Sequence, residues 1–221
     1  MTRSERANQL VEVLPQVYPG AHCELDFKTP LQLLIATILS AQCTDKRVNM
    51  VTPTLFARYR TTADYARAKP AELEKAIQST GFFRNKTKSI RAVCAAIEKK
   101  YGGEVPQTMA ELHALPGIGR KTANVVLGNA FHKNEGIVVD THVMRLSQRL
   151  GLTTQQDPEK IERDLMKLIP QKHWTNWSHW LIWHGRRRSF ARKPDCENCE
   201  LLRLCPSGKK FIRTGEARAS T

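Results

Sequence analysis

The sequence predicts an all-α protein. Apolar residues recur at helical spacing along most of the 221 residues, and no segment shows the apolar and polar alternation of a half-buried strand. The β-branched run at residues 136–139 is too short to found a sheet. We therefore expect a fold in which helices pack on helices.

Six helices are expected in the first hundred residues. The second, LQLLIATIL at residues 31–39, is apolar all round and opens with Thr29 and Pro30, which places it at the centre of a domain. Thr44 or Asp45 is expected to cap the third helix. The expected spans are 1–20, 31–39, from about 46 onward, 62–68, 70–78 and 85–101.

A helical hairpin is expected in the middle of the chain. Thr108 and Glu111 have the spacing with which two side chains cap a helix start, and Pro116 ends that helix because it has no N–H. Gly117 and Gly119 can adopt backbone angles that other residues avoid. The two helices are expected over 109–114 and from about 120 onward.

The glycine turn of this hairpin could bind an anion through its backbone. Amide N–H groups at a helix N-terminus carry a partial positive charge, and a phosphate can come close where no Cβ intervenes. An ordinary helical hairpin would use the same glycines only to make the turn. Arg120 and Lys121 follow the turn directly and favour a phosphate ligand.

The charge balance points to a polyanionic partner. Lysine and arginine outnumber aspartate and glutamate by 35 to 21, which gives a formal net charge of +14. A membrane partner would need a basic amphipathic helix, which the sequence lacks. No apolar run reaches the roughly 18 residues that span a bilayer, and residues 1–6 lack a signal-peptide pattern. We expect a soluble cytoplasmic protein.

The six cysteines fall into two groups. Three are dispersed among expected helices and turns, where they suit a reduced apolar core. The other three, Cys196, Cys199 and Cys205, lie within ten residues near the C-terminus. Such clustering indicates a metal site.

These motifs together resemble the endonuclease III family of helix-hairpin-helix DNA glycosylases and abasic-site lyases. The resembling segments span roughly residues 25–206 and are LPGIGRKTAN at 115–124, VDTH at 139–142, SAQ at 40–42, TD at 44–45 and the cysteine cluster. The resemblance implies a monomer that acts on nucleoid DNA, specifically double-stranded DNA that contains damaged bases.

The same resemblance implies a domain organisation. A six-helix domain would comprise residues 23–133, and an iron–sulfur domain would combine residues 1–22 with 134–213. A DNA cleft would lie between the two domains. Residues 214–221 are polar and are expected to form a disordered tail.

Lys121 and Asp140 are the catalytic residues that the resemblance implies. Lys121 matches the Schiff-base lysine, and positive potential from the helix N-terminus and from Arg120 favours the uncharged amine that a nucleophile needs. From the residues alone, Lys121 would only bind phosphate and Asp140 would only cap a helix. The family assigns its essential carboxylate to Asp140. The reaction that the resemblance implies is release of an oxidised pyrimidine such as thymine glycol, followed by β-elimination of the 3′ phosphate.

The resemblance also assigns interactions with DNA. Gln42 would enter the space left by an extruded base, and Phe82 would be an apolar wedge, whereas Phe83 would pack inside the protein. Other contacts are expected from the residues themselves. The cations beside Phe82, Lys86 among them, would lie on phosphates. Gly117, Gly119 and Arg120 would grip the backbone, as would residues 186–188, Arg192 and Lys193.

The cysteine cluster departs from the family pattern at one position. The family binds a [4Fe-4S] cluster through Cys-x6-Cys-x2-Cys-x5-Cys, and the first of these positions is Ser189 in this sequence. A hydroxyl is a hard ligand where iron–sulfur clusters prefer thiolate. The fourth iron could be held by Ser189 or an outside ligand, or be lost, and a zinc site that includes His184 is a further alternative.

Two other functions fit part of the sequence. An adenine-mismatch glycosylase shares the hairpin, the aspartate and the cluster, but it commonly lacks the lysine and has a large C-terminal recognition domain. Lys121 and the end of the chain at Thr221 argue against it. A structural DNA-binding protein explains the charge and the glycines but leaves Gln42 and Asp140 without a role.

Overall fold

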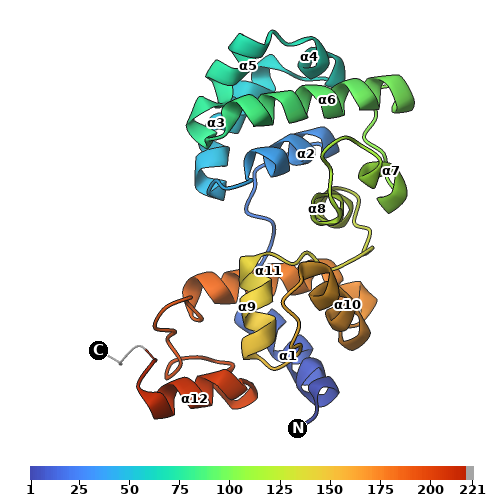
Figure 1. The fold of residues 1–221 in the computed structure, drawn as a ribbon. Helices are drawn as coiled ribbons and strands as arrows, with labels where there is room; N and C mark the ends of the chain where they lie inside the picture. The colour runs from blue at the N-terminus through green and yellow to red at the C-terminus, as the bar shows by residue number, and fades with distance from the viewer. Residues whose placement is uncertain (218–221) are drawn as a thin grey trace. The chain divides into compact units, whose positions relative to one another are not determined.

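The computed structural model describes residues 1–217, and all regular secondary structure in that range is helical (Figure 1). The prediction of an all-α fold is therefore confirmed. The chain divides into two compact units, Cys23–Lys133 and a second unit that joins Met1–His22 with the chain from Asn134 onward. No helix within residues 1–217 has both the length and the apolar character needed to cross a bilayer.

The unit Cys23–Lys133 is built around α2, whose side chains Leu33, Leu34 and Ile35 are completely buried. Both α4 and α5 pack against the long helix α6 (Figure 1). The unit has seven α-helices, one more than the six that the resemblance implies. Its helices are α2 (Pro30–Leu39), α3 (Asp45–Arg58), α4 (Thr62–Arg67), α5 (Pro70–Ile77), α6 (Phe83–Tyr101), α7 (Met109–His113) and α8 (Arg120–Ala130), with a 3-10 helix η1 (Gln78–Thr80).

Threonine caps set the starts of several helices in this unit. The Thr29 hydroxyl accepts a hydrogen bond from the Gln32 amide at 3.2 Å, and Thr44 accepts one from Arg47 at the same distance. Of the two candidates for the cap of α3, Thr44 is therefore the residue that serves. These side chains satisfy amides that have no partner inside the helix, which is why the starts could be located from sequence.

The hairpin between α7 and α8 forms as predicted, with one difference at its glycines. Thr108 caps α7 by accepting a hydrogen bond from the Glu111 amide at 3.3 Å. Gly117 has φ of 76°, in the left-handed region that favours glycine. Gly119, the N-cap of α8, has φ of −84° and ψ of 169°, which any residue can adopt. Only Gly117 is therefore required for the backbone angles of the turn.

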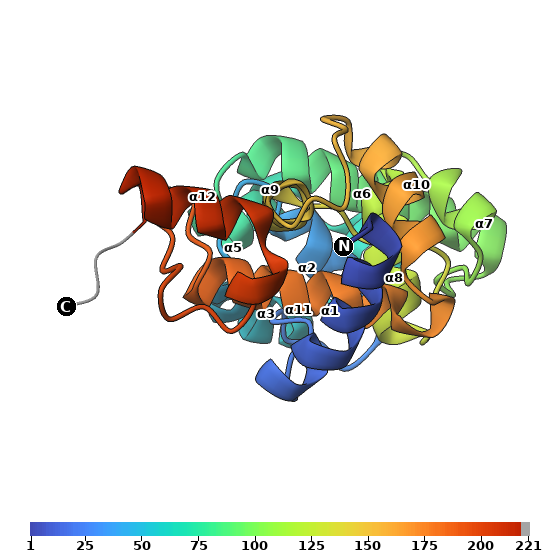
Figure 2. The ribbon, with the colours of Figure 1, turned by 90° about the horizontal axis from the view of Figure 1, so that it is seen from below.

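The other unit has its own core, in which α1 packs against α10 and α11 (Figure 2). Trp177 and Trp180 of α11 are buried in that core. The expected disordered tail, 214–221, overlaps the last residue of α12, and its residues 218–221 lie outside the described part of the chain. The helices of this unit are α1 (Arg3–Val17), α9 (Thr141–Arg149), α10 (Pro158–Leu168), α11 (Trp174–Arg187) and α12 (Pro206–Thr214), with the 3-10 helices η2 (Gln171–His173) and η3 (Leu202–Leu204).

Candidate functional site

The glycine turn of the hairpin presents its backbone to solvent. Leu115 and Ile118 are 3 % and 4 % exposed and anchor the turn in the core, whereas Gly117 and Gly119 are exposed. A Cβ atom added at either glycine would meet no atom within 4 Å. An anion can therefore approach the amides at the N-terminus of α8 without a steric obstacle.

Lys121 lies in the first turn of α8, directly after the glycine turn, and its side chain is exposed. Because it is exposed, burial does not contribute to its reactivity. The groups that place positive potential near Lys121 are the N-terminus of α8 and the neighbouring Arg120. An exposed lysine therefore stands one turn of helix or less from the exposed glycine turn.

Gln42 and Phe82 stand on two turns that share an unusual backbone conformation. Both residues have a left-handed backbone conformation, with φ of 54° for Gln42 and 48° for Phe82. Both side chains are exposed, that of Phe82 by 61 %. A non-glycine residue pays strain energy in this conformation, which is common at functional sites. Phe83, by contrast, packs against the core of the unit, in agreement with the interpretation of the aromatic pair.

One open pocket brings together the side chains of Gln42 and Phe82 with Gly117 of the hairpin. The three predicted DNA-binding segments of this unit, which are far apart in sequence, are therefore neighbours in the fold. The pocket also borders Lys86 and Thr122. Its lining combines an exposed aromatic ring, an amide and a glycine turn, a suitable set for a nucleic acid strand.

The prediction that Lys86 lies on phosphates is wrong. Its side chain is only 5 % exposed, and its Nζ donates hydrogen bonds to the carbonyl oxygens of Leu39 at 2.8 Å and Thr80 at 2.7 Å. Burial lowers the pKa of Lys86. The apolar positions of α6 lie on the same face as Lys86, and a lysine within that apolar pattern is the signal that could have identified it.

In the other unit, Asp140 is the N-cap of α9. Its Oδ1 accepts a hydrogen bond from the Val143 amide at 2.8 Å, so the predicted cap is confirmed. Arg145 of the same helix lies near enough to Asp140 for the two charges to interact. Burial lowers the pKa of Arg145, and the negative charge of Asp140 opposes that shift. The carboxylate is half-buried, and its position is fixed by the helix start.

Close packing of α9 on α11 supports this part of the site. A Cβ atom added at Gly185 of α11 would lie 2.6 Å from the Nδ1 of His142 and 3.0 Å from the Nη2 of Arg145. Arg145 donates from the same Nη2 to the carbonyl oxygens of Gly185 at 3.3 Å and Ser189 at 2.9 Å. Gly185 was not singled out in the sequence, where its only signal is a glycine inside a helical pattern.

The three clustered cysteines line one pocket with Ser189 and His184. Cys196 is 6 % exposed, and burial raises the pKa of all three thiols, that of Cys199 to about 12. A thiol with so high a pKa becomes a thiolate at neutral pH only when a bound metal ion supplies the compensating charge. The chemistry of the donors, three thiols in one pocket, fits an iron–sulfur cluster better than an oxygen-ligated ion.

Ser189 occupies the remaining position of the pattern and is held by an arginine. Its Oγ accepts a hydrogen bond from the Nη1 of Arg149 at 2.9 Å, and the same Nη1 donates to the Phe190 carbonyl oxygen at 2.7 Å. Burial lowers the pKa of Arg149, whereas the nearby thiols Cys196 and Cys205 raise it. A guanidinium therefore sits against the hydroxyl that stands in place of the fourth cysteine.

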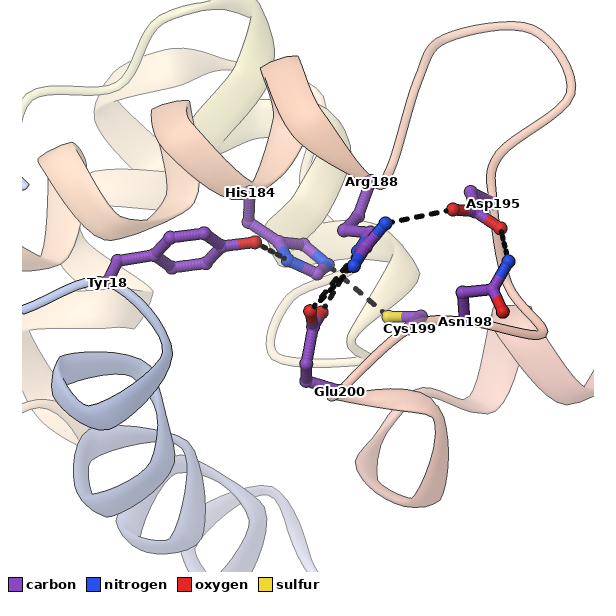
Figure 3. Close-up of polar contacts among 7 residues, drawn as sticks. All are labelled: Tyr18, His184, Arg188, Asp195, Asn198, Cys199 and Glu200. Atoms are coloured by element: carbon purple, nitrogen blue, oxygen red, sulfur yellow. Dashed lines mark hydrogen bonds and ion pairs between the residues drawn. The ribbon is translucent and has the colours of Figure 1, made fainter.

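His184 connects the N-terminal segment to the cysteine loop (Figure 3). Its Nδ1 lies 2.8 Å from the hydroxyl of Tyr18, and its Nε2 lies 3.5 Å from the Sγ of Cys199. Burial lowers the pKa of His184 to about 4, so that the ring is neutral at pH 7 and one nitrogen donates while the other accepts. His184, Cys199 and Glu200 form the one group of possible metal ligands within 4.8 Å of one another in residues 1–217.

Arg188 contributes to the fold of the cysteine loop, which differs from its predicted role on the DNA backbone. Its Nη1 lies 3.1 Å from Asp195 Oδ2 and its Nη2 lies 3.1 Å from Glu200 Oε1 (Figure 3). Arg188 is thus neutralised by two acidic side chains. Arg192 and Lys193, in the same loop, are exposed, and Lys193 has φ of 47°.

A family model for the HhH-GPD superfamily of base excision DNA repair proteins matches residues 35–171. The chain is 57% identical over 208 residues to endonuclease III of Synechocystis sp., covering 94% of this chain and 95% of the relative. It is 38% identical over 210 residues to endonuclease III of Escherichia coli, with coverage of 95% and 99%.

Solved structures of endonuclease III also match this chain over nearly its whole length. A non-covalent endonuclease III–DNA complex superposes with a TM-score of 0.90 at 46% identity, and the match covers 96% of this chain and 99% of that one. A trapped endonuclease III–DNA covalent intermediate, described as an estranged-adenine complex, matches with the same TM-score and identity and with coverage of 96% and 100%. A thermostable thymine-DNA glycosylase, at 21% identity and a TM-score of 0.85, shares the fold.

Proposed function

The chain belongs to the HhH-GPD superfamily of base excision DNA repair proteins and, within it, to the endonuclease III family, and from this membership we propose that it is a bifunctional DNA glycosylase and abasic-site lyase for oxidised pyrimidines. Its substrate would be double-stranded DNA that carries a lesion of the thymine glycol type. It would act as a monomer on nucleoid DNA in the cytoplasm.

The observation that carries the proposal is the position of Lys121. An exposed lysine in the first turn of α8 follows a glycine turn whose amides can hold a phosphate. A backbone phosphate at the turn would bring the sugar of a flipped nucleotide within reach of the amine. A protein that only gripped phosphates would have no need for a nucleophile at that point.

The reaction proceeds in two stages. The lone pair of Lys121 Nζ forms a bond to the sugar C1′, the bond from C1′ to the base breaks, and the base leaves with a proton. Opening of the sugar ring gives an imine between Nζ and C1′. Loss of a proton from C2′ then expels the 3′ phosphate, and water hydrolyses the imine to release Lys121.

Asp140 would supply a fixed negative charge for the first stage. As the N-cap of α9, its carboxylate accepts the Val143 amide and cannot rotate freely. A carboxylate held in this way stabilises the positive charge that develops on the sugar as the base leaves, or accepts a proton from the attacking amine. Gln42 and Phe82 would hold the duplex open at the lesion.

We also propose that Cys196, Cys199 and Cys205 hold a [4Fe-4S] cluster, with Ser189 at the fourth position. The cluster would act as a cross-link between the segments on either side of the loop. This cross-link would keep Arg192 and Lys193 in place to bind phosphates. Three thiols in one pocket support this assignment.

Borohydride trapping tests the proposal. The protein is incubated with a duplex that contains thymine glycol, and sodium borohydride reduces any imine to a stable covalent adduct. We expect an adduct with the wild type and with Lys75→Gln, an exposed lysine on α5, but not with Lys121→Gln. Tight binding without an adduct, and base release without strand cleavage, would indicate a glycosylase that uses water. Binding without base release would indicate a structural DNA-binding protein.

A further inference from the structure

Lys86 is a buried lysine that the proposed reaction does not use. It projects from the first turns of α6, and its Nζ donates to two carbonyl oxygens, those of Leu39 at 2.8 Å and Thr80 at 2.7 Å. Leu39 is the last residue of α2 and Thr80 is the last residue of η1. One ammonium group thus joins the C-terminal ends of two helices that are about forty residues apart in sequence.

The two helix ends lead directly to the two strained turns. Gln42 follows Leu39 by three residues, and Phe82 follows Thr80 by two. Both residues have positive φ, both are exposed, and both line the same open pocket. Nζ of Lys86 therefore bridges the bases of these two turns.

A charged donor is well suited to this position. Carbonyl groups at the end of a helix have no partner within the helix and carry a partial negative charge, which an ammonium group satisfies. Thr80 is itself fixed, because its buried hydroxyl donates to the Ile77 carbonyl oxygen at 2.8 Å. An apolar side chain in place of Lys86 would leave both carbonyls buried without this donor.

We propose that Lys86 is a positioning residue for lesion recognition: its ammonium group holds the Gln42 turn and the Phe82 turn at the separation needed for both side chains to enter the duplex at one nucleotide. The proposal rests on the proposed function, since it gives those two side chains their role in DNA. Lys86 would act through these two turns and not on the reacting atoms.

The test compares Lys86→Met with Lys88→Met. Lys88 is exposed on the same helix, so the control removes the same charge without breaking the link between the turns. The probe is a duplex that contains tetrahydrofuran, an abasic analogue on which Lys121 cannot form an imine. Lesion preference is the ratio of the Kd for undamaged duplex to the Kd for the probe, and thermal unfolding verifies that each variant is folded.

We expect Lys86→Met to lose roughly 10- to 100-fold of lesion preference, the penalty of misplaced recognition groups, while Lys88→Met keeps the wild-type ratio. With 2-aminopurine opposite the tetrahydrofuran, the fluorescence rise that reports base unstacking should be lost in Lys86→Met alone. Lys86→Gln, which keeps a shorter N–H donor, should give a partial loss, and it serves as the test variant if Lys86→Met does not fold.

A double-mutant cycle separates positioning from a general loss of stability. If Lys86 acts through the Phe82 turn, adding Lys86→Met to Phe82→Ala should reduce lesion preference much less than it does in the wild type. Wild-type preference and fluorescence in a folded Lys86→Met protein, or fully additive losses in the cycle, would overturn the proposal. Absence of borohydride trapping by the wild type would instead refute the lyase function and leave this binding comparison valid.

Discussion

Asp140 combines a structural and a chemical role, and two substitutions separate them. Asp140→Asn keeps a side-chain oxygen that can accept the Val143 amide but removes the negative charge. Asp140→Ala removes both. We expect Asp140→Asn to fold with nearly wild-type stability and to lose activity, and Asp140→Ala to lose activity and stability together.

The magnitudes follow from the cap geometry. Loss of an aspartate N-cap costs about 1 kcal/mol of unfolding free energy, within a range of roughly 0.5–2 kcal/mol. For a protein of this size that corresponds to a Tm lower by about 2–4 °C. Loss of a positioned proton acceptor slows a reaction by roughly 10²- to 10⁴-fold. Asparagine and aspartate are similar caps, so that Asp140→Asn should change Tm by much less than Asp140→Ala.

Single-turnover release of base from a thymine glycol duplex measures the chemical role, and thermal unfolding measures the structural one. Asp157→Ala is the matched control. Asp157 is the N-cap of α10 in the same unit, and its Oδ1 accepts from the Lys160 amide at 2.9 Å. Asp157→Ala should lower Tm by about as much as Asp140→Ala does, within the range expected for a cap, and leave the rate of base release unchanged.

Two results would refute this reasoning. If Asp140→Asn released base at the wild-type rate, Asp140 would be a cap and nothing more. If Asp157→Ala slowed base release as much as Asp140→Ala, the loss of activity would come from helix destabilisation and would give no information about the carboxylate.

Three further changes test other parts of the protein. Ser189→Cys should keep four irons per protein and slow the loss of iron to a chelator, measured by metal analysis and visible absorbance, because thiolate is the preferred ligand; fewer than four irons in the wild type would contradict a four-iron site with Ser189 at the fourth position. Arg192→Ala with Lys193→Ala should lower the slope of log Kd against log salt by about 0.9 for each phosphate that is no longer neutralised, and an unchanged slope would show that the loop does not bind the DNA backbone. Gly185→Ala should destabilise the protein in urea, because overpacking against His142 costs about 1–3 kcal/mol, against a helix-propensity gain of at most about 1 kcal/mol. A stabilised Gly185→Ala variant would show that α9 moves aside.

Features that depend on a few neighbouring residues were available from the sequence. Thr29, Thr108 and Asp140 cap helices whose starts were predicted, because a cap satisfies amides two or three residues further along the same chain. The buried character of α2 followed from its uniformly apolar composition. The glycine turn before Arg120 was also predictable, although only Gly117 needs a positive φ.

The roles of the cations were decided by the tertiary structure. The sequence made phosphate binding a possible role for Lys86, Arg188 and Lys121. In the structure, however, Lys86 is buried under two helix ends, and Arg188 is paired with Asp195 and Glu200. Their partners, apart from Thr80, lie seven or more residues away in the chain, so no local pattern predicts them. Gly185 depends in the same way on its packing against α9.

The sequence by itself therefore determined the helical fold, the hairpin, the cysteine cluster and the identity of Lys121 and Asp140 as candidates. The tertiary structure alone decided which charged side chains remain available to a ligand. The physical reason is that helix formation and capping are governed by nearby residues, whereas burial and ion pairing depend on which distant segments pack together.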